Sequence, residues 1–329
     1  MTDLSLMSAI QLVDGFRCGE FSPEDAARAA LDSIRAHDGE VNAFVLVDEQ
    51  AALAQARAST RRWRAGNPLG PADGVPASIK DMLLTRGWPT LRGSTLVDES
   101  RSWDVDAPAV ARLRENGAVF LGKTTTPEFA WKGVTDSIRH GATGNPWGAG
   151  LTSGGSSGGA ATAVGLGMGT WSVGTDGGGS VRIPASFTGT VALKPTFGRV
   201  PIYPPSPYGT LSHAGPMTRT VTDAALLLDL IARPDSRDWA ALDPPTASYP
   251  RGSRRWRRRL AHRALVHAGV RAQRLRGRLG GAGGRAGARR RRCPRRGGGP
   301  GHHRLRGGLP HPVVHRGGQS DRAVWRGSD

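Results

Sequence analysis

The chain has 329 residues, a length that suits one large domain or two smaller ones. Its formal charge of +18 belongs to the end of the sequence, because residues up to 250 carry about 22 Lys and Arg against about 25 Asp and Glu. The total charge is therefore no evidence that the first 250 residues bind nucleic acid. The apolar runs are too short for a membrane span, and the first residues lack the pattern of a signal peptide, so we expect a cytoplasmic protein with no membrane partner.

The first 70 residues are expected to form an N-terminal helical region. Ser22 and Pro23 mark a helix start, because Ser caps a helix and Pro suits its first position. Apolar positions recur at helical spacing on both sides of this start. The helices expected here cover residues 6–17, 26–36 and 50–64, with a strand over residues 41–47.

Residues 71–245 alternate short apolar strands with helices, which is typical of an α/β protein with helices packed on a sheet. One strand contains Lys80 after Val75, Ala77 and Ile79. Most lysines lie on the surface, but this position predicts that the Lys80 side chain enters the interior. Further elements expected in this core are helices over 107–116, 160–169 and 221–232 and strands over 118–121 and 191–193.

A glycine-rich stretch over residues 152–195 carries two serines in tight turns, Ser156 and Ser180. Such crowding of glycines requires positive φ angles or a close approach of the backbone to something else. A phosphate-binding loop would end in Gly-Lys-Ser/Thr, which does not follow here. The run GLGMG (165–169) lacks the acidic partner of a dinucleotide fingerprint, and the apolar flanks argue against a plain surface loop.

The same stretch also fits the nucleophile-elbow pattern G-x-S-x-G, with Ser157 at its centre. Asp176 and His213 follow in the order of a hydrolase triad. They follow too soon, however, because a hydrolase sheet needs further strands and helices between the triad members. The elbow is therefore the weaker interpretation of these serines.

The order of the motifs resembles the amidase signature family over roughly the first three quarters of the chain. The matching motifs are GVPASIKD (74–81), GGSSGG (154–159), GTDGGGSVRIPA (174–185) and GTVALKPTFGRV (189–200). The resemblance implies the fold of that family, a mixed β-sheet covered by helices on both faces. It also implies that the C-terminal part of the family fold is missing from this chain.

The resemblance implies a catalytic triad of Ser180, Ser156 and Lys80. Ser180 is expected to be the nucleophile, and Ser156, after a cis Gly155–Ser156 peptide bond, is expected to pass its proton to Lys80. A lysine can act as a base when burial lowers its pKa. The resemblance places the oxyanion hole at the backbone N–H groups of Gly177, Gly178, Gly179 and Ser180. It also implies that the side chains of Thr175, Asp176 and Arg182 hold this turn in place.

Phe129 and Trp131 are candidates for the substrate pocket, and ordinary core packing is an equally good interpretation of both. The chemistry calls for no metal and no organic cofactor. The identity of the amide does not follow from these motifs, and a homodimer is left open.

From residue 251 the composition changes to Arg and Gly, with blocks such as RRWRRR (254–259) and RRRR (289–292). We expect residues 246–329 to be disordered or to result from a shifted reading frame, because GC-rich alanine codons become Arg and Gly codons when the frame shifts. The alternative is a genuine basic tail that binds nucleic acid.

The expected activity is hydrolysis of a carboxamide to a carboxylate and ammonia or an amine, through an acyl-enzyme on Ser180. An alternative within the family is the A subunit of a glutamyl-tRNA(Gln)/aspartyl-tRNA(Asn) amidotransferase, which releases ammonia from glutamine. Two further alternatives are a basic-tailed nucleic-acid-binding protein and an inactive fragment.

Overall fold

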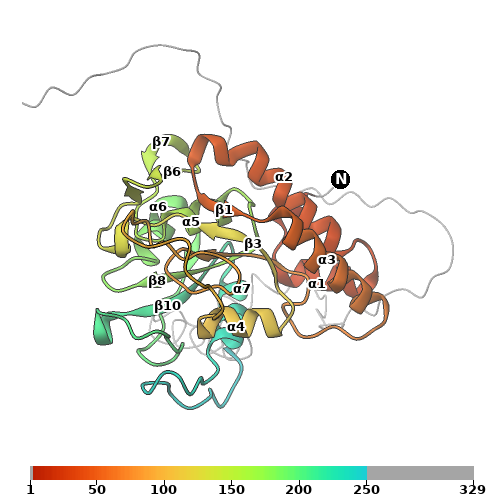
Figure 1. The fold of residues 1–329 in the computed structure, drawn as a ribbon. Coiled ribbons are helices and arrows are strands. Elements are labelled where there is room, and N and C mark those ends of the chain that lie inside the picture. The colour runs from red at the N-terminus through yellow and green to blue at the C-terminus, as the bar shows by residue number, and fades with distance from the viewer. Residues whose placement is uncertain (1–2, 250–329) are drawn as a thin grey trace, which may run out of the picture.

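The computed structural model describes residues 3–249 (Figure 1). Residues 250–329 lie outside the described residues, so the expectations for the Arg/Gly-rich tail stay predictions. The helices are α1 Ala9–Cys18, α2 Pro23–Val41, α3 Glu49–Arg64, α4 Pro108–Glu115, α5 Gly158–Gly165, α6 Arg182–Thr188 and α7 Val221–Ile231, with 3-10 turns η1 Leu4–Leu6, η2 Glu128–Ala130 and η3 Gly209–Leu211. Within the described part, no helix combines the length and the apolar character needed to cross a membrane.

A six-stranded mixed sheet forms the centre of the molecule, in the order β1-β3-β2-β8-β10-β9. Strands β3, β2 and β8 run parallel, whereas β1, β10 and β9 join by antiparallel pairing. The strands of this sheet are β1 Phe44–Val47, β2 Pro76–Lys80, β3 Val119–Thr124, β8 Trp171–Asp176, β9 Val191–Ala192 and β10 His213–Thr218. Two small hairpins pair β4 Asp136–Ser137 with β5 Gly141–Ala142, and β6 Gly144–Asn145 with β7 Gly148–Thr152.

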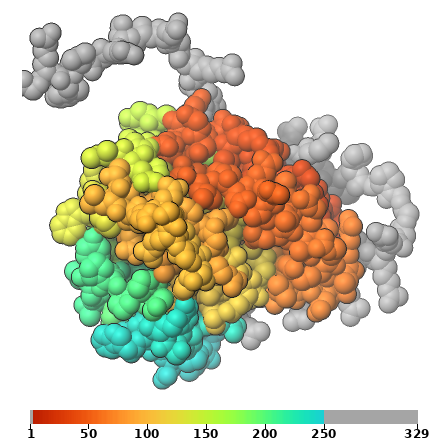
Figure 2. All heavy atoms as spheres, in the orientation of Figure 1, coloured from red at the N-terminus to blue at the C-terminus, as the bar shows by residue number. Residues whose placement is uncertain are grey.

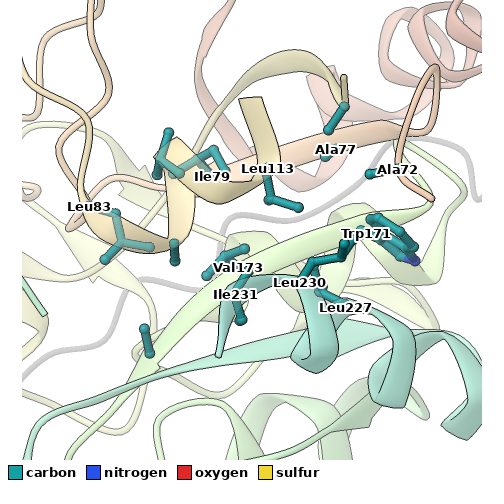
Figure 3. Packing of buried hydrophobic residues seen from close by; sticks show 14 of the residues in the cluster. Ala72, Ala77, Ile79, Leu83, Leu113, Trp171, Val173, Leu227, Leu230 and Ile231 are labelled. Atoms are coloured by element: carbon teal, nitrogen blue, oxygen red, sulfur yellow. The ribbon is translucent and has the colours of Figure 1, made fainter. Parts of the chain in front are cut away.

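Helices cover both faces of this sheet, as expected for the fold class. Side chains of a strand alternate between its two faces, and in β3 Phe120 packs in one apolar cluster whereas Val119 and Leu121 pack in another. The first cluster joins the sheet to α4 and α7, and Figure 3 shows Leu113, Leu227 and Ile231 of these helices against it. The second cluster joins the sheet to α2, α3 and α5; its buried members from these helices are Ala27, Ala30, Leu31, Ile34, Val41, Ala52, Ala56 and Ala163.

The N-terminal helices pack directly on the sheet. Ser22 and Asp25 form a capping box at the start of α2, with Pro23 at its first position, which confirms the predicted start. The same region supplies β1, which pairs with β3. On the face seen in Figure 2, the red and orange N-terminal residues lie against the central part of the chain without a gap. The division into regions 1–70 and 71–245 stays a prediction.

Arg219, just after β10, ties the first residues of the chain to the rest. Its buried guanidinium donates hydrogen bonds to the carbonyls of Ser5 and Met7 at 2.9 Å, to Val164 at 2.8 Å and to Gly169 at 3.1 Å. Burial lowers the pKa of Arg219 to about 10, and the nearby Asp223 and Asp3 oppose that shift.

The sequence prediction lacked two strands of the sheet, β8 and β10. Both contain residues that favour strands weakly: Gly174 and Asp176 in β8, and the pair Gly215-Pro216 in β10. They become strands because each pairs with the other over six residues, and this tertiary pairing overrides local preference.

Candidate active site

Lys80 is the last residue of β2, and the alternation of the strand decides where its side chain goes. Ala77 and Ile79 face the cluster with α4 and α7, so Ser78 and Lys80 face the opposite side. Ser78 donates there to Ser172 of β8 at 2.9 Å. Lys80 is fully buried, which confirms that it enters the interior.

The amino group of Lys80 contacts three hydroxyl groups. It lies 2.7 Å from Ser156 Oγ, 2.9 Å from Ser157 Oγ and 2.9 Å from Thr175 Oγ1. No carboxylate forms an ion pair with it within residues 3–249. Burial therefore lowers the pKa of Lys80 well below its ordinary value, and the charge of Asp176 opposes that shift only in part. The site favours a neutral amine.

The turn that carries Ser156 packs so tightly against neighbouring backbone that only glycine fits at positions 155 and 159. A Cβ on Gly155 would lie 2.4 Å from the carbonyl of Val134, and a Cβ on Gly159 would lie 2.5 Å from the carbonyl of Ala43. The Gly155–Ser156 peptide bond is cis, as the family resemblance implied. The glycines of GGSSGG therefore allow the turn and the start of α5 to approach neighbouring backbone.

Ser157 has its hydroxyl proton committed to the backbone. Its Oγ donates to the carbonyl of Thr175 at 3.0 Å and accepts from the Thr175 N–H at 3.3 Å. As an ammonium group Lys80 donates to all three hydroxyls. A neutral amine has two N–H groups and one lone pair, so loss of a proton from Lys80 requires one of these hydroxyls to donate to it. Ser156 and Thr175 have this capacity, because neither hydroxyl has another partner in the described part of the chain.

The turn after β8, which carries Ser180, is built around Asp176. Its carboxylate accepts from the N–H of Gly179 at 2.7 Å and of Val181 at 3.2 Å, and it pairs with Arg182 through two bonds of 2.9 Å. Burial disfavours the charged form, but these hydrogen bonds, from Arg182 above all, outweigh burial and lower the pKa of Asp176. Asp176 and Arg182 thus hold this turn together, whereas Thr175 contacts Lys80 itself.

The four backbone N–H groups expected to form the oxyanion hole differ in their hydrogen-bond partners. The N–H of Gly179 donates to Asp176, so it is committed within the turn. The N–H groups of Gly177, Gly178 and Ser180 make no hydrogen bond to the described residues. These three groups, rather than all four, are free to donate to a ligand.

Ser180 lies close to the turn of Ser156 but is not joined to it by a hydroxyl hydrogen bond. The backbone carbonyl of Ser180 accepts from the N–H of Ser157 at 3.0 Å. Its side-chain hydroxyl makes no hydrogen bond within residues 3–249. The structure thus brings Lys80 and Ser156 together, whereas Ser180 is linked to the neighbouring Ser157 through the backbone and its hydroxyl has no partner among residues 3–249.

Phe129 and Trp131 are surface residues, which excludes ordinary core packing for both. Phe129 is 37% exposed and Trp131 is 77% exposed. Sequence reasoning missed Tyr208, whose ring stacks on Trp131, and it missed the contact of His213 with Lys194 at 3.1 Å. No local pattern marks Tyr208, because its contact with Trp131 comes from tertiary structure.

Comparison with known proteins identifies the family of the chain. The family model "Amidase" matches residues 25–265. The chain belongs to the amidase signature family. Residues 3–249 contain no cluster of His, Cys, Asp or Glu side chains that could hold a metal ion.

Relatives within the family include the A subunit of the glutamyl-tRNA(Gln) amidotransferase from Myxococcus xanthus, 44% identical over 76% of this chain and 51% of that protein. Among solved structures, a bacterial aryl acylamidase of the amidase signature family is 35% identical, with a TM-score of 0.67 over 72% of this chain and 50% of that chain. A peptide amidase from Stenotrophomonas maltophilia is 33% identical, with a TM-score of 0.67 over 74% of this chain and 51% of that chain. The chain spans about half the length of the relatives it matches.

Proposed function

We propose that this amidase-family chain hydrolyses a carboxamide through an acyl-enzyme on Ser180. The observation that carries the proposal is the fully buried Lys80, whose amino group has three hydroxyl partners and no paired carboxylate within residues 3–249. A serine hydroxyl is a weak nucleophile until a base takes its proton. Lys80, with its lowered pKa, is that base.

The reaction proceeds by two acyl transfers. Neutral Lys80 takes the proton of Ser156, Ser156 takes that of Ser180, and Ser180 Oγ bonds to the amide carbon. The negative oxygen that forms accepts hydrogen bonds from the free N–H groups of the 177–180 turn, each worth about 10²–10³ in rate. The C–N bond then breaks as the amine receives the proton back through Ser156. Water, deprotonated by the same relay, bonds to the acyl carbon, and the Ser180 Oγ–C bond breaks as the proton returns from Lys80 through Ser156 to Ser180, which releases the carboxylate product.

Two details of the geometry support this assignment over the nucleophile elbow at Ser157. The Ser157 proton is directed at the carbonyl of Thr175, so Ser157 cannot serve as the attacking group without breaking that bond. Ser180 has a hydroxyl with no partner among the described residues, at the turn with three free N–H donors. Catalytic hydrogen bonds often form only when substrate binds, so the open contact between Ser156 and Ser180 agrees with the relay.

A reactive fluorophosphonate probe tests the assignment. We expect mass spectrometry of the labelled chain to place the adduct on Ser180, and we expect Ser180→Ala to abolish labelling. Ser157→Ala should retain it. An adduct on Ser157 in the parent chain would establish the elbow instead.

The second candidate is glutamine hydrolysis as the A subunit of an amidotransferase, which the 44% identity to the Myxococcus xanthus protein favours. Glutamine hydrolysis measured with the chain alone, and again with added partner subunits, separates the two. Activity that appears only with the partners would assign the amidotransferase role. The cytoplasm is the proposed location in either case.

A further inference from the structure

Two aromatic rings meet on the surface beside the turns of Ser156 and Ser180. Trp131 is 77% exposed although its side chain is large and apolar. It stacks on the half-buried Tyr208, with 6.0 Å between ring centroids and 24° between ring planes, which lies in the range of offset stacking. Since Tyr208 contacts one side of the indole, the remainder is open to a second planar group.

The segment that carries Trp131 is held in an unusual backbone conformation. Phe129 has φ 48° and Ala130 has φ 59°, both in the left-handed region that residues with a side chain rarely adopt. Tyr208 Oη donates to the Phe129 carbonyl at 2.9 Å, and the Phe129 N–H donates to the carbonyl of Arg92 at 2.8 Å. Strained residues cluster at ligand sites, where the surrounding contacts enforce them.

This segment lies directly against the Ser156 turn. The carbonyl of Val134 occupies the space of a Cβ on Gly155. Thr135 Oγ1 accepts from the N–H of Gly158 at 2.9 Å, at the first residue of α5. Trp131 therefore lies three residues before a stretch of backbone that packs against the Ser156 turn.

The segment after Tyr208 lies against the other turn. His213 Nδ1 contacts the carbonyl of Leu211 at 2.8 Å and that of Asp176 at 3.2 Å. A Cβ added to Gly177 would lie 3.7 Å from the carbonyl oxygen of Leu211. The stacked rings thus join two segments, one beside Ser156 and one beside the turn of Ser180.

We propose that Trp131 and Tyr208 bind an aromatic ring of the amide substrate. The proposal rests on the proposed hydrolysis at Ser180, because it concerns the substrate of that site. Flat π-systems recognise planar groups by stacking. The nearest charge on the same segment, Lys132, is already paired with Asp136 at 2.6 Å, which favours an uncharged ring over an anionic group.

Binding to the full-length Ser180→Ala chain tests this without requiring turnover. Benzamide carries its ring on the acyl side, acetanilide carries it on the amine side, and propionamide has no ring. We expect benzamide or acetanilide to bind more tightly than propionamide in calorimetric titrations. Adding Trp131→Ala should weaken that ring-bearing ligand about threefold to tenfold and leave propionamide unchanged.

Three further variants separate stacking from general damage. Tyr208→Ala should match Trp131→Ala, whereas Tyr208→Phe keeps the ring and should lose less affinity. Trp239→Ala is the matched control, because Trp239 is 87% exposed and makes no contact with either ring. Unaltered melting temperatures establish that each variant is folded.

The proposal is overturned if neither aromatic amide is preferred over propionamide, or if Trp131→Ala weakens all three ligands equally or not at all. A ring preference that depends on Trp131, in a chain whose Ser180-containing form hydrolyses none of these amides, would support the ring site and reject the proposed hydrolysis. The two failures are therefore distinguishable.

Discussion

Two fully buried lysines stand on neighbouring strands, Lys80 at the end of β2 and Lys123 near the end of β3. Lys123 forms an ion pair with Asp81 at 3.0 Å and donates to the carbonyls of Leu83 and Pro89 and to Thr90 Oγ1. Lys80 has three hydroxyl partners and no ion pair in the described residues.

The two lysines are equally buried, so the difference in their hydrogen-bond partners distinguishes a structural lysine, Lys123, from one that can transfer a proton, Lys80. Burial lowers the pKa of Lys123 to about 8 while the Asp81 ion pair opposes the shift. Burial also lowers the pKa of Lys80, which has no such ion pair in residues 3–249. The ion pair and carbonyls of Lys123 hold a fixed proton, whereas the hydroxyls around Lys80 can both give and take one. Partner chemistry, and not depth, decides which lysine can act as a base.

The largest expected effect comes from removing the base. Lys80→Met should lower kcat by about 10²–10⁴, the usual contribution of acid–base catalysis, and should leave the circular-dichroism spectrum unchanged. Amide hydrolysis at saturating substrate measures the loss. Retention of more than about a hundredth of the parent activity would contradict the base role.

Removing the other lysine should damage stability. Lys123→Met leaves the Asp81 carboxylate buried without its partner, which costs about 3–5 kcal/mol in the free energy of unfolding. Urea titration measures the change. The double variant Lys123→Met with Asp81→Asn should recover part of it, and a single variant as stable as the parent would show that the pair contributes nothing.

The support of the Ser180 turn should matter less than the base. Asp176→Asn keeps the size of the side chain but removes the charge that pairs with Arg182, and hydrogen bonds to charged groups contribute about 1.5–3 kcal/mol. We expect kcat to fall about tenfold to a hundredfold with little change in KM. If Lys123→Met, normalised to folded protein, lowered kcat as much as Asp176→Asn does, the two lysines could no longer be distinguished as structural and catalytic.

The smallest expected effect is a shift in pH dependence. Activity requires the unprotonated form of Lys80, so kcat/KM should rise with pH up to the lowered pKa of Lys80, below its ordinary 10.5. Thr175→Val removes an acceptor of the ammonium form, which lowers that pKa further and moves the rising limb to lower pH by up to about one unit.

Thr90→Val provides the control for that profile, since Thr90 accepts from Lys123 in the same way. It should leave the rising limb of the pH–rate profile in place. A limb that moves equally in both variants would mean that the shift does not report on Lys80.

The sequence predicted the elements with strong local signals. The start of α2 follows from Ser22 and Pro23, and the burial of Lys80 follows from the apolar run before it. The resemblance selected Ser156 and Ser180 because their turns have a motif-level pattern. These predictions depend on short stretches of chain, which is why they could be made without the structure.

What the sequence could not predict depends on contacts between distant segments. The donation from Ser157 to the Thr175 carbonyl joins α5 to β8, and no pattern within either segment reveals it. The commitment of the Gly179 N–H to Asp176 requires a turn conformation that motif matching does not resolve. The stack of Trp131 on Tyr208 spans two loops with no shared periodicity.

Arg219 has a practical consequence for handling the protein. Its guanidinium binds the carbonyls of Ser5 and Met7 on one side, and on the other the carbonyl of Val164 at the end of α5 and a carbonyl in the loop before β8. The helix that follows Ser157 is therefore anchored, at its far end, to the beginning of the polypeptide. Deleting residues 1–7, for example to trim the terminus for crystallisation, would remove two carbonyl partners of the buried Arg219 guanidinium. The end of α5 would then lose its link to the start of the chain, and the turn of Ser156 and Ser157 before α5 would be less firmly held.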